Sequence, residues 1–124
     1  MTYKSVRSDV LKSLPSPCAH THEIKTEEFT MLGVKGQADF AVLTITLDIA
    51  DKGNAPELKS VKLYLWQYRN CVMSYERAAG LLLEHFKSEY DPVHINVTLV
   101  FKTRGGLTST IDTWSWSDER KSDG

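Results

Sequence analysis

The chain has 124 residues, of which 41% are hydrophobic and 25% charged, a balance typical of one globular domain. Its formal net charge of -1 and sequence pI near 6.4 argue against direct binding to tRNA or to an anionic membrane, because phosphate binding normally shows as an excess of Lys and Arg. No apolar run approaches the roughly 20 residues that span a bilayer, so we expect a cytoplasmic protein without a membrane segment.

The first half of the chain predicts a polar arm, then a glycine-flanked turn, then one long strand. Residues 1–27 are polar and broken by prolines, which indicates an N-terminal arm with a short helix over residues 8–14. From Phe40 onward apolar and polar side chains alternate, which is the period of a half-buried strand. The apolar members of this alternation are Leu43, Ile45, Leu47 and Ile49.

The second half predicts a strand, a helix and two more strands. Residues 58–70 alternate again, with one face aromatic and basic, and are predicted as a strand. Residues 74–90 change to three- and four-residue spacing, which predicts a helix capped by Ser74. Two final strands are expected over residues 93–103 and 107–117.

These elements together predict an α+β fold, in which an antiparallel sheet carries its helical material on one face. Each neighbouring pair of strands is joined by a connection short enough for a hairpin. We expect one domain over residues 1–124, ending in a charged, disordered tail over residues 117–124.

Two clusters have the chemistry of a phosphate site, since cationic side chains, a hydroxyl donor and glycine N–H groups can all face an anion. The competing interpretations are solvated strand-edge lysines and an ordinary hairpin turn. The clusters are Lys59, Ser60 and Lys62, and Arg104, Gly105 and Gly106.

The thiols and histidines give weaker signals. Cys18, His20 and His22 are spaced by twos and lie on one side of an extended segment, but no fourth ligand is identifiable, so we predict no metal site. Cys18 and Cys71 are too few for a disulfide framework, and neither has the electropositive setting of a reactive thiol.

Four segments of the chain resemble the QueF family of NADPH-dependent nitrile reductases. They are "GQADFA" at 36–41, "ELKSVKLYLWQYRN" at 57–70, Tyr75 with Glu76, and "FKTRGG" at 101–106. That family reduces 7-cyano-7-deazaguanine to 7-aminomethyl-7-deazaguanine on the way to queuosine in tRNA. The resemblance implies a tunnelling fold, in which subunits assemble into pentameric or stacked β-barrel rings with active sites between neighbours.

The resemblance also implies roles for individual residues. Asp39 corresponds to the proton donor, Glu76 to the carboxylate that anchors the base, and Tyr75 stands where the family has a histidine. Substrate binding would involve Tyr75, Glu76 and Ser60. NADPH would be held by Glu57, Lys59, Lys62, Arg104, Gly105 and Gly106.

One departure from the family decides the interpretation. The family's nucleophilic cysteine, which forms a covalent thioimide with the nitrile, lies seven residues before the aspartate. That position is Leu32, and the segment between Glu28 and Asp39 is one residue shorter than usual. Neither Leu32 nor Gly33 can attack a nitrile, and Thr30 has no visible base.

Three readings remain open. The chain could retain a pocket for a 7-deazaguanine or related purine or pterin while lacking the thioimide route. It could be an active enzyme, either a reductase with a relocated cysteine or a QueF-like amidinotransferase. It could also be a non-catalytic assembly partner, and a tunnelling-fold domain without any ligand is the plainest alternative.

Overall fold

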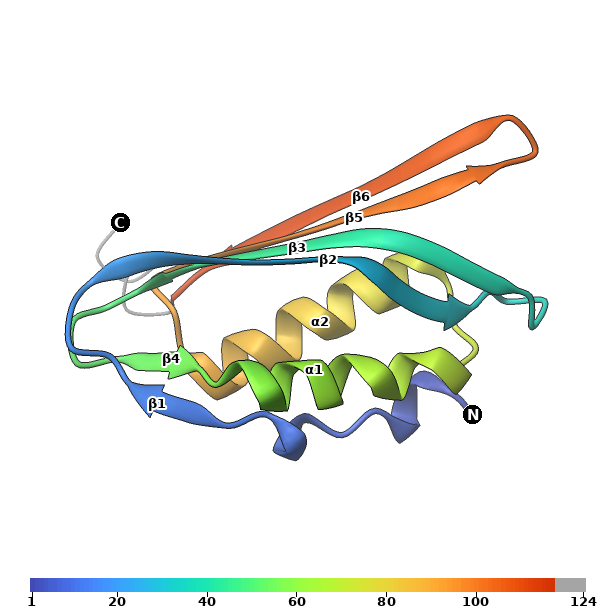
Figure 1. The fold of residues 1–124 in the computed structure, drawn as a ribbon. Coiled ribbons are helices and arrows are strands. Elements are labelled where there is room, and N and C mark those ends of the chain that lie inside the picture. The colour runs from blue at the N-terminus through green and yellow to red at the C-terminus, as the bar shows by residue number, and fades with distance from the viewer. Residues whose placement is uncertain (118–124) are drawn as a thin grey trace.

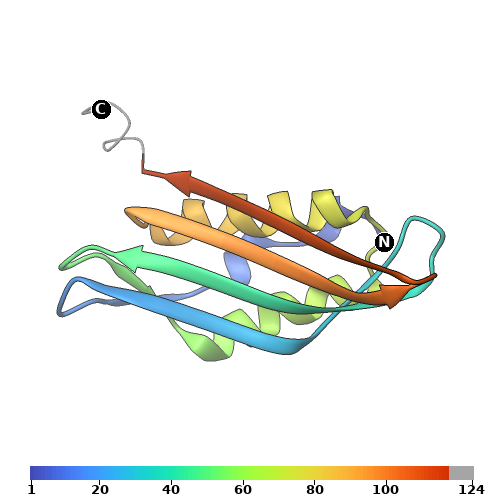
Figure 2. The same ribbon diagram turned by 90° about the horizontal axis from the view of Figure 1, so that it is seen from above.

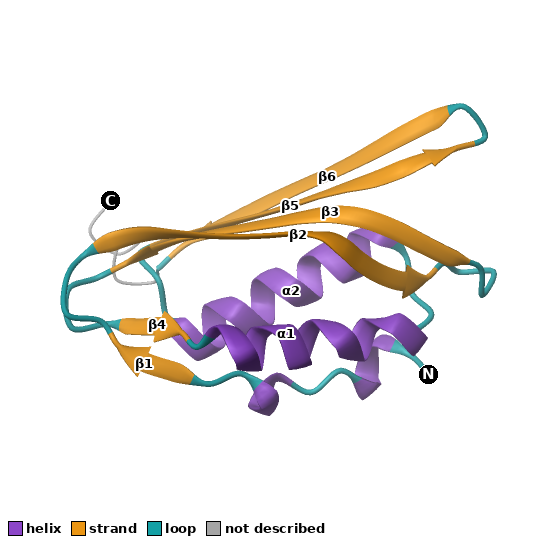
Figure 3. Ribbon diagram, in the orientation of Figure 1, coloured by secondary structure: helices purple, strands orange, loops and turns teal. Residues whose placement is uncertain are grey.

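The computed structural model describes residues 1–117, and the tail predicted to be disordered lies outside these residues except for Ser117. A four-stranded antiparallel sheet forms one layer and two helices form the other, as Figure 1 and Figure 3 show. The sheet runs in the order β2-β3-β5-β6, seen from above in Figure 2. The α+β prediction, with helices on one face of an antiparallel sheet, is confirmed.

The elements follow one another along the chain with two small additions to this plan. A two-stranded sheet, β1 with β4, lies at one end of the molecule, and three short 3-10 helices flank the helices proper. The bounds are η1 (Tyr3–Ser5), η2 (Ser8–Val10), β1 (Ser13–Pro15), β2 (His20–Leu32), β3 (Ala38–Ile49), β4 (Asn54–Pro56), α1 (Leu58–Trp66), η3 (Gln67–Asn70), α2 (Tyr75–Tyr90), β5 (His94–Arg104) and β6 (Leu107–Trp116).

The centre of the sheet supplies most of the core. The alternating residues of β3 are buried toward the helices, and β5 pairs with it so that Ile45 lies beside Val97 and Leu43 beside Leu99. Each such side chain contributes roughly 1.5–3 kcal/mol by leaving water. Within residues 1–117, no helix combines the length and apolar content needed to cross a bilayer.

Helix α2 matches its sequence prediction. The Ser74 side chain accepts a hydrogen bond from the Arg77 N–H at 3.1 Å, which caps the first turn. Asp91 ends the helix in the left-handed conformation, with φ 44°, and Pro92 follows. The buried face of α2 consists of Ala78, Ala79, Leu81, Leu82, Phe86 and Tyr90.

The strand predicted over residues 58–70 is wrong, because this segment forms α1 and η3. Its alternation also fits a helix: Val61, Tyr64 and Tyr68 recur at three- and four-residue steps and are all buried. Leu63, which a strand would bury beside Val61, is 44% exposed. The sheet is consequently built from β2–β3 and β5–β6 hairpins, with both helices in the connection between them.

The polar arm predicted over residues 1–27 is wrong in its second part, where β2 begins at His20. Its side chains are alternately half-buried and exposed, and few are apolar, so the sequence carries little hydrophobic periodicity. The predicted helix over residues 8–14 is reduced to η2 and β1.

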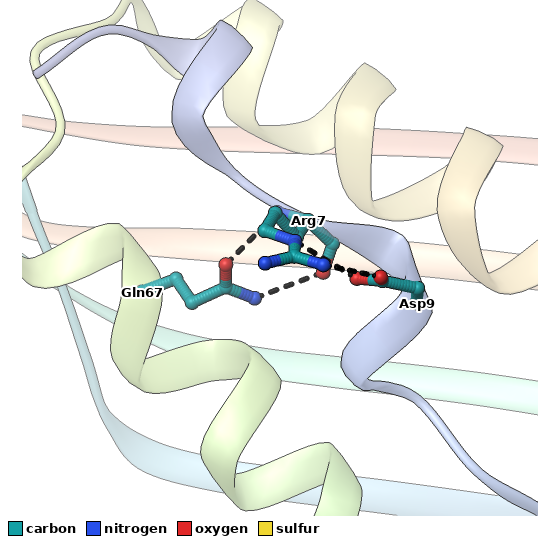
Figure 4. Close-up of polar contacts among 3 residues, drawn as sticks. All are labelled: Arg7, Asp9 and Gln67. Atoms are coloured by element: carbon teal, nitrogen blue, oxygen red, sulfur yellow. Dashed lines mark hydrogen bonds and ion pairs between the residues drawn. The ribbon is translucent and has the colours of Figure 1, made fainter.

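The beginning of the chain packs against the helices. Figure 4 shows how Gln67 holds the segment: its Oε1 accepts from the Arg7 N–H at 2.8 Å and its Nε2 donates to the Arg7 carbonyl at 3.0 Å. Arg7 also forms an exposed ion pair with Asp9 at 2.6 Å. Val6 and Leu11 are buried in the main core. The first residues are therefore part of the folded layer.

Candidate functional site

A cavity of about 300 Å³ lies where the β2–β3 turn meets the start of α2, at one end of the molecule (Figure 1). We call it the Asp39 cavity. Its lining residues are Gly33, Val34, Lys35, Gln37, Asp39, Met73, Ser74 and Tyr75.

The backbone brings these two segments together. Leu32 donates its N–H to the Cys71 carbonyl at 3.0 Å and accepts from the Met73 N–H at 3.1 Å, which fixes the end of β2 beside the segment that leads into α2. The turn itself closes through the Gly33 N–H on the Gln37 carbonyl at 2.8 Å and the Gly36 N–H on the Gly33 carbonyl at 2.7 Å. Leu32, which the family resemblance places at the nucleophile's position, has its backbone engaged in this bridge.

Asp39 and Tyr75 are the side chains that give the cavity its chemistry. Asp39 stands near the start of β3 and is only 8% exposed. Tyr75 opens α2, and its ring stacks on Phe101 of β5 with centroids 3.7 Å apart and planes 7° from parallel. A carboxylate that accepts N–H donors beside a fixed aromatic ring suits a planar, hydrogen-bonding heterocycle.

Glu76 lies in a different depression, of about 390 Å³, between the first residues of the chain and α2. It lines this depression with Tyr3, Arg77 and Glu84, and Ser74 is the one residue that also lines the Asp39 cavity. Tyr75 lines the Asp39 cavity, whereas Glu76 lines this second depression. Within one chain, the structure does not bring Asp39 and Glu76 into one cavity.

The Glu57–Lys62 motif begins α1, and two of its side chains serve the start of that helix. Glu57 Oε2 accepts from the Ser60 N–H at 2.7 Å, and the Ser60 hydroxyl donates to the Glu57 carbonyl at 2.7 Å. Ser60 Oγ also accepts from the Lys12 N–H at 2.9 Å, and the residue is 4% exposed. These contacts make a helix cap, and neither residue lines the cavities described above.

A groove of about 310 Å³ runs between α1 and β2, and we call it the α1 groove. Its cationic edge is Lys62 and Arg69, whose charged groups lie 5.0 and 5.2 Å from the Trp66 ring. Trp66 and Arg69 were not predicted as site residues. The signal was the spacing of 62, 66 and 69, which is one face of a helix and becomes visible only once the segment is known to be helical.

The remaining predicted phosphate ligands lie elsewhere. Lys59 is exposed on α1. Gly105 and Gly106 make the β5–β6 hairpin turn with φ 58° and 81°, so the hairpin interpretation is confirmed. Figure 1 shows this turn at the end of a hairpin that projects beyond the helices.

Neither thiol is placed as a nucleophile in the described structure. Cys71 is 1% exposed, its Sγ donates to the Gln67 carbonyl at 3.2 Å, and burial raises the pKa of this thiol. Cys18 is exposed, and its carbonyl accepts from Ser16. Among residues 1–117 no group of three or more His, Cys, Asp or Glu side chains is arranged to hold a metal ion.

A buried polar cluster, unforeseen from sequence, joins α1, η3 and α2. Tyr64 lies at its centre, with its hydroxyl 2.7 Å from the Tyr68 hydroxyl and 2.7 Å from His85 Nδ1. Burial raises the pKa of both tyrosines and lowers the pKa of His85. These shifts keep all three side chains in their neutral forms, as a hydrogen-bonded cluster in a core requires.

The fold defines an α+β protein with helices on one face of an antiparallel sheet, and comparison with known proteins gives the family. A sequence profile described as "QueF-like protein" matches residues 38–121, which begin directly after the β2–β3 turn. A Prosthecochloris aestuarii protein named NADPH-dependent 7-cyano-7-deazaguanine reductase is 39% identical over 103 residues, which cover 82% of this chain and 85% of the relative. A protein of the same name from Thioalkalivibrio sulfidiphilus is 37% identical over 93 residues, covering 74% and 70%. The chain belongs to the QueF-like family.

The structural comparison agrees with the fold class. The archaeosine synthase QueF-Like in its apo form matches with a TM-score of 0.66 and 18% sequence identity, covering 81% of this chain and 95% of that one. At this identity the likeness shows the fold alone. The tunnelling fold expected from the sequence is confirmed.

Proposed function

We propose that this chain binds 7-cyano-7-deazaguanine, or a related purine or pterin, in the Asp39 cavity and does not form a thioimide with it. The observation that carries the proposal is a cavity that retains the carboxylate and an aromatic ring but has no cysteine among its described lining residues. Its Ser74 hydroxyl caps α2. A base can be recognised there, whereas the family's covalent step has no thiolate to perform it.

The α1 groove supports a phosphate-bearing ligand as the second component. Lys62 and Arg69 flank Trp66 at the edge of an apolar groove, and cations held in this way can pair with phosphate oxygens. The residues therefore fit NADPH, which would supply a hydride when bound. By family resemblance we assign Glu57, Lys59, Lys62, Arg104, Gly105 and Gly106 to this ligand. Of these, Lys62 lines the α1 groove, whereas Gly105 and Gly106 lie in the β5–β6 turn and do not line it.

The test is a calorimetric titration of 7-cyano-7-deazaguanine into the protein with NADPH present, alongside a measurement of NADPH oxidation. We expect saturable heat without oxidation. Sustained oxidation would contradict the proposal and point to a relocated nucleophile, with Cys18 and Cys71 the first residues to replace. An absence of heat would mean that the ligand class has changed.

Two variants test whether the base binds in the Asp39 cavity. Asp39→Asn should weaken base binding by roughly tenfold or more, because a charge-assisted hydrogen bond contributes about 1.5–3 kcal/mol. Asp51→Asn, which removes an exposed carboxylate from a distant turn, is the matched control. Equal affinities for these two variants would place the base outside the Asp39 cavity.

We further propose that complete sites form between copies of the chain in a homo-oligomeric ring. The observation that favours this arrangement is the separation of Asp39 and Glu76 into two depressions of one chain. Each copy would then present one half-site to each neighbour.

Mixed oligomers test this assembly directly. Asp39→Asn and Glu76→Gln chains should each bind weakly alone, and co-assembly of equal amounts should restore about one quarter of the sites, since both intact halves must meet. No restoration in a verified mixed oligomer would place each site within one chain. Co-expression with a cysteine-bearing homologue would test the assembly-partner reading, which mixed rings would support.

The structural likeness does not favour the amidinotransferase hypothesis, because a match at 18% identity shows only the fold. A gel shift with unmodified tRNA and with tRNA carrying the cyano base tests it. Given the near-neutral charge, we expect no shift with either.

A further inference from the structure

The carboxylate of Asp39 lies directly against the backbone of Gly33, at the base of the Asp39 cavity. A Cβ atom built on Gly33 would fall far inside the contact distance of Asp39 Oδ2, and 3.6 Å from its Cγ. The third of the three nearest atoms is the Gln37 carbonyl oxygen, at 3.6 Å, which is an ordinary contact. The space that a side chain at position 33 would need is therefore taken by one carboxylate oxygen.

Backbone conformation does not explain the glycine. Gly36 in the same turn has φ 76°, a value that favours glycine, whereas Gly33 is not in the left-handed region. An alanine at position 33 would fit the local backbone. What excludes it is the Asp39 side chain.

If a Cβ is added at position 33, the Asp39 carboxylate cannot stay where it lies. Its backbone is fixed in β3 opposite Met31, and the next ladder pair joins Ala38 to Leu32. The carboxylate is the mobile end of a short side chain, so a Cβ on residue 33 would rotate it away more easily than it would move the hydrogen-bonded turn. The identity of residue 33 therefore sets where the carboxylate lies.

We propose that Gly33 is the positioning residue of the Asp39 cavity, and that its missing side chain lets the Asp39 carboxylate lie against the turn, where it faces N–H donors of a bound heterocycle. This inference rests on the proposed function for the ligand, although the Gly33–Asp39 contact exists without one.

A double-mutant cycle in thermal unfolding tests the contact without any ligand. Gly33→Ala should lower Tm by roughly 5 °C or more in the wild-type background, through overpacking. In the Asp39→Ala background the same change should leave Tm nearly unchanged, because the clashing oxygen is gone. Gly80→Ala is the matched control: a Cβ there has no neighbour within 4 Å, and the change should raise Tm slightly in both backgrounds.

Each outcome of the double-mutant cycle either supports or overturns the proposal. Failure of Gly33→Ala to fold, together with normal folding of Gly33→Ala/Asp39→Ala, supports the proposal. Equal losses in the two backgrounds, or no loss in either, overturn it, since Gly33 would then act on the turn itself or on nothing.

Wild type, Gly33→Ala, Asp39→Ala and the double variant are also titrated with 7-cyano-7-deazaguanine. A purely structural role of Gly33 would not produce the pattern of affinities expected from positioning. Gly33→Ala should weaken binding about tenfold in the wild-type background and leave the residual affinity of Asp39→Ala unchanged. Weakening by the same factor in both backgrounds overturns the positioning role. If wild type binds no base, the proposed function fails, while the Tm cycle still decides the Gly33–Asp39 contact.

Discussion

Helix α1 and the Asp39 cavity use the family's sequence features in opposite ways. The Glu57–Tyr64 motif is fully present, yet Glu57, Ser60 and Tyr64 are engaged in capping α1 and in the polar cluster beneath it. The Asp39 cavity lies at the turn where the sequence predicts a departure from the family, and it combines an open volume with a carboxylate. We therefore expect the motif to serve mainly as a scaffold and the turn to carry the proposed chemistry.

The largest expected effect comes from the buried side of α1. Tyr64→Ala should lower the free energy of unfolding by about 3–5 kcal/mol, because it empties a fully buried aromatic site. It also removes the hydroxyl that joins Tyr68 to His85. Leu63→Ala, on the exposed side, should cost less than about 1 kcal/mol. Chemical denaturation measures both, and a larger loss for Leu63→Ala would return this segment to the strand interpretation.

A smaller effect distinguishes a structural role of Ser60 from a role in substrate binding. Ser60→Ala should cost about 1–2 kcal/mol of stability, because it leaves the Lys12 N–H without its hydroxyl acceptor and removes the hydroxyl's bond to the Glu57 carbonyl. We expect base affinity to stay within about twofold of wild type. Ser88→Ala, at an exposed position of α2, is the matched control. Loss of base binding with unchanged stability would instead make Ser60 a substrate contact, as the family resemblance implies.

The smallest effect concerns pH and the polar cluster. Burial lowers the pKa of His85 in the folded chain, so the unfolded chain takes up its proton first as pH falls below about 6.5. His85 therefore favours the folded state above that pH, and this stability is lost on acidification toward the folded pKa. His85→Gln should make unfolding stability less dependent on pH between about pH 7 and pH 5.

His22 should contribute to the same pH dependence in the same direction. Burial, and secondarily the charge of His20, also lowers the pKa of His22, so His22→Gln should flatten the same pH profile independently. The double variant should be flatter than either single variant. An unchanged slope in His85→Gln would show that the Tyr64 hydrogen bond does not depend on the neutral imidazole.

The amino-acid sequence by itself determined the strongly periodic parts of this protein. Strand β3, helix α2 with its Ser74 cap, and strand β5 each bury one regular face, so their hydrophobic spacing was sufficient. Strand β6 alternates between exposed and half-buried residues with the same period. The sequence also singled out Asp39 and led to the prediction that the family's cysteine position is Leu32, because such a prediction depends on residue identity and count.

Only the tertiary structure decided the rest. Whether residues 58–70 form a strand or a helix depended on which side chains the sheet would cover, since their spacing fits both periods. The first part of edge strand β2, residues 20–27, was hidden because its side chains are alternately half-buried and exposed. The contact of Gly33 with Asp39, and the separation of Asp39 from Glu76, arise between segments whose distance in space the residue spacing does not specify.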